Sequence, residues 1–185
     1  MARRVLFVQG GGKDVHDTWD NALVDSLRRG LGMGYSVRYP RMPNEDDPHF
    51  AAWKAALAHE FTSLQAGEIL VGHSMGATIL LHTLVDMPPA VTPGALILLS
   101  APFIGPGGWP SEEMKPRDDF SGSLPADMSV RIYHGTKDKE VPFAHAELYA
   151  KAIPDAVLIP IENANHQLDD NLTRIAHDLR ALDEE

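Results

Sequence analysis

The sequence predicts a doubly wound α/β fold, in which helices cover both faces of a parallel sheet of about six strands. Short apolar runs rich in β-branched residues recur along the chain, each bounded by glycines or turn residues. Most are nearly continuous rather than alternating, as expected for strands buried on both faces. Segments of helical period separate most of them, and strands that alternate with helices form parallel sheets through right-handed crossovers.

Six runs are the expected strands, and two of the segments between them show the helical period clearly. The runs are RVLFVQ (4–9), SVRYP (36–40), EILVGH (68–73), ALILLS (95–100), VRIYHG (130–135) and AVLIPI (156–161). One face of the first expected helix carries Leu23, Leu27 and Leu31. One face of the second carries Phe50, Trp53, Leu57 and Phe61. Side chains at this spacing lie on one side of a helix, so each helix has an apolar face.

Residues 103–128 break this rhythm with four prolines and four glycines. We expect them to form an inserted loop or short lid, because long connections without regular structure in compact domains are often functional. The whole chain, 1–185, is expected to be one domain, since 185 residues are enough to close a sizeable core.

Composition restricts the classes of function. The chain has 26 acidic and 16 basic residues, and its net charge of -10 repels polyanions, so nucleic acid is not an expected partner. It has no cysteine, which excludes disulfides, thiolate nucleophiles and cysteine-based zinc sites. No window reaches the roughly 18 unbroken apolar residues of a membrane-spanning helix, and the first residues lack the core and cleavage site of a signal peptide. We therefore expect a cytoplasmic enzyme or binding domain without membrane association.

The stretch LVGHSMGATIL (70–80) places Ser74 between two glycines, Gly72 and Gly76. Ser74 follows an expected strand and precedes an apolar helix, and ligands of parallel α/β sheets bind at the carboxyl ends of the strands. A nucleophile on such a sharp turn is strained, and side chains at the two glycine positions would clash with neighbouring backbone. The alternative is that Ser74 only caps the helix. The strand before it and the helix after it favour the nucleophile.

A serine hydroxyl is a weak nucleophile at neutral pH, so it needs a base and a group that orients the base. Asp138 and His166 each lie a few residues past an expected strand, on the same rim of the sheet as Ser74. The chain order serine, aspartate, histidine occurs in one class of catalytic triads. His16 and His49 also lie near strand exits and compete for the role of base, whereas the remaining histidines are expected to pack or to be solvated.

The acid that orients the base has rivals. They are Glu140, Asp169 and Asp170. Glu140 lies two residues beyond Asp138, and the sequence alone does not separate these two. His73 adjoins the nucleophile but is expected to point to the other side of the turn.

An oxyanion hole needs two donors where the carbonyl oxygen becomes negative. One is expected to be the amide of Met75, which follows the nucleophile. The other is expected from the glycines after the first strand, with Gly11 preferred over Gly12. A phosphate-binding loop is the alternative, but neither GxGxxG nor GxxxxGK[ST] spacing is present, although Lys13 follows the glycines.

Three aromatic residues of the 103–128 segment are candidates for the apolar wall of a substrate pocket. They are Phe103, Trp109 and Phe120. These side chains would equally serve to anchor the segment to the core. The helix after Ser74 is strongly apolar, so the side chains of Met75, Ile79 and Leu80 are expected in the core rather than in contact with substrate.

Taken together, these residues make the chain resemble the α/β-hydrolase superfamily, and within it the small serine hydrolases of the retinoblastoma-binding-protein type. The resemblance is carried by a glycine loop with Trp19 after it, RYPRMPNEDDPHFAAWKAAL (38–57), VGHSMGA (71–77), HGTKDKEVP (134–142) and NANHQL (163–168). It implies about six parallel strands, without the antiparallel strands of larger relatives. It also implies Ser74, Asp138 and His166 as the triad. One departure is Gln9 before Gly10, where the usual residue is histidine, and it leaves the second oxyanion donor open.

The resulting prediction is a serine hydrolase that cleaves an ester, thioester or amide of a small-molecule acyl substrate. No metal and no organic cofactor are implied, because side chains and backbone amides handle every charge change. Two alternatives remain. One is a binding or regulatory protein that keeps the triad but turns over little, and the other is an acyltransferase or carbon–carbon bond hydrolase on the same scaffold. The sequence identifies no protein partner.

Overall fold

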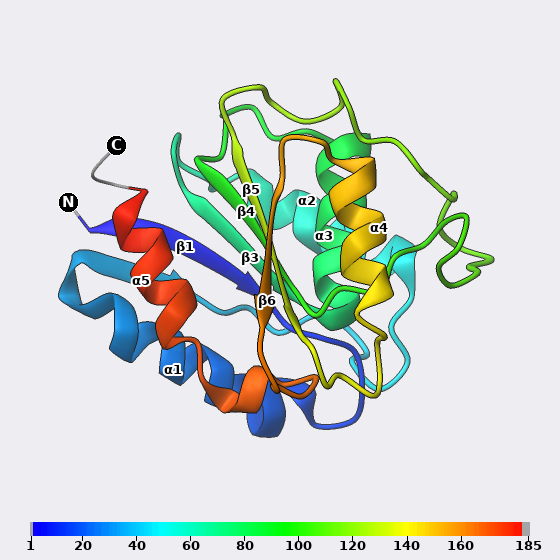
Figure 1. Cartoon of the computed structure of the whole chain (residues 1–185). Helices are drawn as coiled ribbons and strands as arrows, with labels where there is room; N and C mark the ends of the chain where they lie inside the picture. Colours follow the sequence, from blue (N-terminus) through cyan, green and yellow to red (C-terminus); the bar gives the residue numbers. More distant parts are fainter. Residues whose placement is uncertain (1, 183–185) are drawn as a thin grey trace.

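A computed structural model describes residues 2–182 and confirms the predicted α/β fold (Figure 1). Six parallel strands form one sheet in the order β2-β1-β3-β4-β5-β6. They are β1 (Arg3–Val8), β2 (Tyr35–Arg38), β3 (Ile69–His73), β4 (Ala95–Leu99), β5 (Ser129–Gly135) and β6 (Val157–Ile161). Each matches one predicted run with ends within two residues. Strands β3 and β4 are buried along their whole length, which explains their unbroken apolar sequence.

The strand order has one reversal, between β1 and β3. The chain first moves from β1 to its neighbour β2, with Val5 opposite Val37, and then returns to the other side of β1, with Val5 opposite Ile69. From β3 it continues in one direction to β6. Where the strand order reverses, a crevice opens at the carboxyl ends of the strands, and ligands of open α/β sheets bind there.

Helices cover both faces of the sheet (Figure 1). One face packs against α1 (Asp20–Leu31) and α5 (Thr173–Ala181), and the other against α2 (Phe50–Phe61), α3 (Ser74–Asp86) and α4 (Ala144–Ala152). Shorter helical turns span Val15–Trp19, Gly32–Gly34 and Leu168–Asp170. The predicted leucine face of α1 is buried, as is the face of α2 with Trp53, Leu57 and Phe61. No helix in the described part of the chain is long and apolar enough to cross a membrane.

The 103–128 segment contains no helix or strand, and its one β-bridge joins Ile104 to Trp109. Its buried apolar side chains belong to the core on the side of α2, α3 and α4. They are Phe103, Ile104, Met114, Phe120 and Met128. The segment is therefore anchored to the core at several points along its length.

Candidate active site

Ser74 lies directly after β3 and begins α3, with a backbone φ of 51°. This left-handed conformation is strained for a residue with a side chain, and such strain costs about 1–3 kcal/mol and clusters at functional sites. A Cβ atom at Gly72 would lie 2.5 Å from the Cα of Ala77, and one at Gly76 would overlap the carbonyl oxygen of Gln9. The turn therefore needs both glycines, for the steric reason that the sequence suggested.

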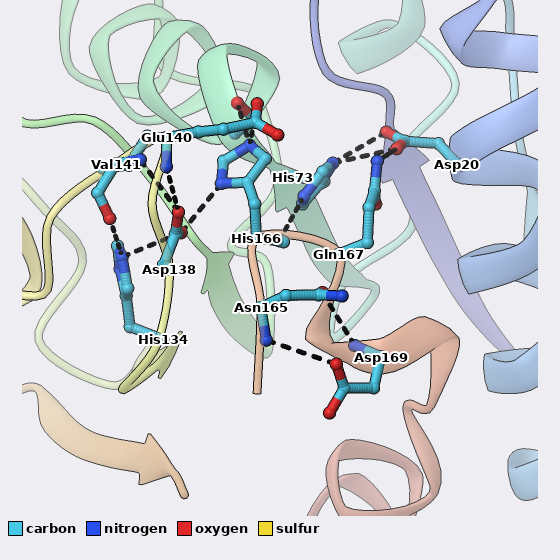
Figure 2. Close-up of polar contacts among 11 residues, drawn as sticks. Asp20, His73, His134, Asp138, Glu140, Val141, Asn165, His166, Gln167 and Asp169 are labelled. Atoms are coloured by element: carbon cyan, nitrogen blue, oxygen red, sulfur yellow. Dashed lines mark hydrogen bonds and ion pairs between the residues drawn. The ribbon is translucent and has the colours of Figure 1, made fainter. Parts of the chain in front are cut away.

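His166 connects the serine to a carboxylate. Its Nε2 lies 3.0 Å from the Oγ of Ser74, and its Nδ1 lies 2.8 Å from the Oδ2 of Asp138. The three side chains come from segments that follow β3, β5 and β6, and all three strands end at the same edge of the sheet. Figure 2 shows the Asp138 carboxylate pointing at the ring of His166. The structure thus brings together the three residues that the sequence nominated.

Asp138 is held as a carboxylate by donors on both oxygens. Its Oδ1 accepts hydrogen bonds from the amides of Glu140 and Val141, each at 2.9 Å. The Nε2 of His134 lies 3.2 Å from Oδ2, which also faces His166. Burial alone would raise the pKa of Asp138, but the hydrogen bonds from His134, His166 and Val141 outweigh it and hold the pKa far below its usual range.

None of the rival acids reaches the Nδ1 of His166. The side chain of Glu140 is 73% exposed, and its Oε2 lies 3.9 Å from Nε2, the nitrogen that faces Ser74. Asp169 accepts from the amide of Asn165 instead, and Asp170 is exposed to solvent. The rival bases are also elsewhere, since His16 stacks on Tyr39 and His49 pairs with Glu113.

The loop after β1 brings backbone amides to the cavity at Ser74. The amide of Gly10 donates to Asp20 at 2.6 Å, and that of Gly12 donates to the carbonyl of Glu45 at 2.6 Å. Among residues 2–182 we find no acceptor for the amide of Gly11, which lines the cavity at Ser74. Met75 lies in the first turn of α3, where backbone amides have no partner within the helix.

Gln9 anchors the same loop through its side chain. Its Nε2 donates to the carboxylate of Glu45 at 2.5 Å, and its Oε1 accepts from the amide of Met42 at 2.9 Å. The side chain is fully buried, so these bonds hold the start of the glycine loop against the segment after β2.

A cavity of about 300 Å³ opens at Ser74. Besides the serine and His166, it is lined by Gly10, Gly11, Gly12, Lys13, Val15, Trp19, Asp20, His73, Glu140 and Gln167. Val15 and Trp19 supply its apolar wall, and Lys13 and Glu140 supply charged groups. The sequence had singled out Trp19 only as part of the family resemblance, because nothing in the spacing shows that its side chain faces the site.

The three aromatic residues predicted to form the wall of the substrate pocket lie away from the cavity at Ser74. Phe103 and Phe120 are 2% and 1% exposed and belong to the core, so the core-anchoring alternative describes them. Phe103 packs edge-on against Tyr149 of α4 with ring centroids 5.0 Å apart. Trp109 packs edge-on against His145. None of the three lines the cavity at Ser74.

The expectation for Met75 is corrected as well. Ile79 and Leu80 are buried as predicted, but Met75 is only partly buried. Its side chain lines a second cavity of about 270 Å³, together with Pro48, Phe50, Ile79 and the 111–114 segment. Met75 lies in the first turn of α3, where the helix meets the surface, and the helical pattern alone does not show this.

The fold and the site together define a hydrolase class, in which a serine on a strand-to-helix turn meets a histidine and a carboxylate from later strands. The chain belongs to the alpha/beta hydrolase family, whose sequence profile matches residues 5–131. The matched part contains Ser74 and ends before Asp138 and His166. No curated protein matches the sequence.

Solved structures show the same fold. The ydeN gene product of B. subtilis is 20% identical, with a TM-score of 0.76 and full coverage of both chains. Alpha/beta hydrolase domain-containing protein 10 from mouse is 17% identical with a TM-score of 0.68, and the match covers 98% of this chain and 89% of that one. XC6422 from Xanthomonas campestris, described as a serine hydrolase without lid, is 16% identical with a TM-score of 0.66, covering 98% and 82%. The narrower retinoblastoma-binding-protein type stays a prediction.

Proposed function

We propose that this chain is a serine hydrolase that cleaves a carboxylic ester, thioester or amide through an acyl-enzyme on Ser74. The observation that carries the proposal is the continuous path from the Ser74 hydroxyl through both ring nitrogens of His166 to Asp138, with contacts of 3.0 and 2.8 Å. Nucleophile, base and orienting group within hydrogen-bond reach are the arrangement that activates a serine.

In the first half of the reaction, Ser74 Oγ attacks the carbonyl carbon while Nε2 of His166 takes the hydroxyl proton. The carbonyl π-electrons move to oxygen, and the amides of Gly11 and Met75 donate to the resulting oxyanion. When the tetrahedral intermediate collapses, the bond to the leaving group breaks. His166 returns the proton to the leaving group, and the acyl group stays on Ser74.

In the second half, water replaces the leaving group. His166 takes a proton from water, the hydroxide attacks the acyl carbon, and collapse of the second intermediate returns the proton to Ser74 Oγ. Asp138 stays ionised throughout, because its pKa is held low, and it stabilises the imidazolium that forms in both halves. The reaction consumes one water and releases an acid and an alcohol, thiol or amine.

The test is a chain-length series of p-nitrophenyl esters and a fluorophosphonate probe, applied to the wild type and to Ser74→Ala. We expect ester hydrolysis and labelling at Ser74 in the wild type, and a loss of turnover on the order of a million-fold in the variant. Turnover retained by a correctly folded Ser74→Ala variant would reject the assignment. Labelling at Ser74 without hydrolysis of any ester would favour the weakly active binding protein or an acyltransferase.

A further inference from the structure

A second buried histidine–carboxylate pair lies beside the first and has no part in the proton transfers above. His73, the last residue of β3, and Asp20, the first residue of α1, have side chains that are 2% and 0% exposed. The Nδ1 of His73 lies 2.9 Å from Oδ1 and 3.0 Å from Oδ2 of Asp20. Figure 2 shows this pair on the opposite side of His166 from Asp138.

The surroundings of His73 define its protonation. Its Nε2 lies 3.2 Å from the backbone carbonyl oxygen of His166, so both ring nitrogens face oxygen acceptors. Beside an ionised Asp20, a neutral imidazole with its one N–H would leave one of these contacts without a hydrogen. An imidazolium beside an Asp20 carboxylate satisfies both contacts. The other way to satisfy them is a protonated Asp20 that donates to a neutral His73, and it is disfavoured because both oxygens of Asp20 also accept hydrogen bonds, from Gly10 and from Gln167.

The electrostatics agree with this reading. Burial alone would lower the pKa of His73, but the negative charge of Asp20 and the hydrogen bonds to Asp20 and to the His166 carbonyl raise it. Burial alone would raise the pKa of Asp20, but the charge and hydrogen bond of His73 and the bond from Gly10 lower it. Two other titratable groups lie near His73. The charge of Asp138 also raises the pKa of His73, and the ring centroid of His166 lies 5.1 Å from that of His73.

The pair connects the three segments that build the site. Besides His73, the Asp20 carboxylate accepts from the amide of Gly10 at 2.6 Å and from the Nε2 of Gln167 at 3.4 Å. His73 itself precedes Ser74 and holds the His166 carbonyl. A Cβ atom on Gly10 would lie 3.3 Å from the ring of His73 and 3.2 Å from the Cβ of Ser74, so the glycine loop packs directly on both.

We propose that the Asp20–His73 ion pair positions His166 and the Gly10–Gly12 loop for attack by Ser74, an inference that rests on the proposed serine-hydrolase function. Neither residue touches the reacting atoms, so both are positioning residues. An ion pair this deeply buried adds little net stability over apolar side chains of similar size, because desolvation of the two charges opposes their attraction. Its main physical effect is to hold the backbone of His166 and the loop with the free Gly11 amide in one geometry.

The variant Asp20→Asn tests this role, because it removes the charge at nearly constant volume. We expect kcat and the rate of fluorophosphonate labelling at Ser74 to fall by about 10- to 100-fold, because small misplacements of catalytic groups cause losses of this size. KM should change little. The matched control is Asp25→Asn, on the same helix, whose carboxylate bonds Arg28 at the surface and which should match the wild type. Circular dichroism and thermal unfolding verify the fold of each variant.

Two further readouts separate positioning from a merely structural effect. In Asp20→Asn the pKa of His73 should fall, because burial then acts without the opposing charge of Asp20, and its ionisation should add to the acid side of the kcat/KM profile. The double variant Asp20→Asn/His73→Gln should lack this ionisation and lose no more activity than either single variant, because the two residues act as one unit. Nitrogen-15 NMR of the wild type should show protons on both ring nitrogens of His73 at pH 7, and this measurement does not depend on any variant folding.

A single ring N–H on His73 would overturn the ion pair. Wild-type turnover and labelling in folded Asp20→Asn would overturn the positioning role while leaving the proposed function standing. A wild type that neither hydrolyses esters nor reacts with fluorophosphonate would instead refute the proposed function, and the positioning role with it.

Discussion

His166 lies between two buried carboxylates that contact it in different ways. Asp138 bonds the Nδ1 of its ring, whereas Asp20 reaches its backbone carbonyl through the ring of His73. The Asp138 side is closed by Val141 and by His134, which is fully buried, while Asp20 and His73 border the cavity at Ser74. Asp138 therefore acts on the charge of the His166 imidazole, whereas Asp20 acts on the position of the His166 backbone.

This difference predicts how much each carboxylate contributes to the reaction. The proton on the Nε2 of His166 arrives and leaves twice in each proposed cycle, and Asp138 stabilises the cation each time it forms. His73, the partner of Asp20, keeps its charge throughout the cycle, so Asp20 contributes only by holding the geometry of the site. Removing the charge of Asp138 should therefore slow the chemical step far more than removing that of Asp20.

The largest effect expected from this comparison is that of Asp138→Asn. An asparagine there would present an N–H group or a neutral oxygen to Nδ1, which favours the wrong tautomer of His166 and leaves its cation unsupported. We expect kcat to fall by about 10⁴-fold, the loss typical of this change in serine triads, in steady-state assays on a p-nitrophenyl ester. Asp170→Asn is the control, because Asp170 is an exposed rival from the same rim, and it should stay within about two-fold of the wild type. A loss no greater than that of Asp20→Asn would show that both carboxylates act only by positioning.

The same comparison shows what the sequence reveals about a site. Ser74, Asp138 and His166 were predictable because each follows an apolar run that reads as a strand, and parallel strands end at one edge of a sheet. The two glycines around Ser74 pointed to a sharp turn for a steric reason that holds in the structure. The strands themselves were predictable because burial on both faces leaves a continuous apolar run.

Asp20 and His73 were not predictable in this way. Asp20 begins a helix, where an acidic residue is ordinary, and its contact with His73 depends on how α1 lies across the end of β3. The aromatic wall was misplaced for a related reason. Whether Phe103 and Phe120 face a cavity or the core depends on the path of a segment with no periodic pattern, and that path takes both into the core. Non-local packing decided these side chains, and local pattern does not encode it.

Asp138 and His73 should also limit stability at opposite ends of the pH range. Asp138 has a pKa below its ordinary value of 3.8, so its contribution is present above that pH and is lost as the pH falls through the folded-state value. His73 has a pKa above its ordinary value of 6.5, so its contribution is present below that pH and is lost as the pH rises through the folded-state value.

Thermal unfolding followed from about pH 1 to pH 10 measures both losses of stability, the acid limb and the alkaline limb. Relative to the wild type, Asp138→Asn should flatten the acid limb and His73→Gln the alkaline limb. Each unit of difference between a folded and an unfolded pKa is worth about 1.4 kcal/mol, or about 3–5 °C for a domain of this size. An alkaline limb unchanged in His73→Gln would mean that His73 is neutral in the folded wild type.

The smallest expected effect distinguishes the open side of His166 from the closed one. Trp19, which precedes Asp20, is 55% exposed and lines the cavity at Ser74, whereas Trp109 of the 103–128 segment packs on His145 away from it. If the substrate occupies the side bordered by Asp20, Trp19→Ala removes apolar contact with it and should raise KM for p-nitrophenyl esters by about 3- to 10-fold at similar kcat, the effect of losing about 1 kcal/mol of uniform binding. Trp109→Ala, the matched tryptophan truncation, should leave KM unchanged. The reverse result would place the substrate against the 103–128 segment.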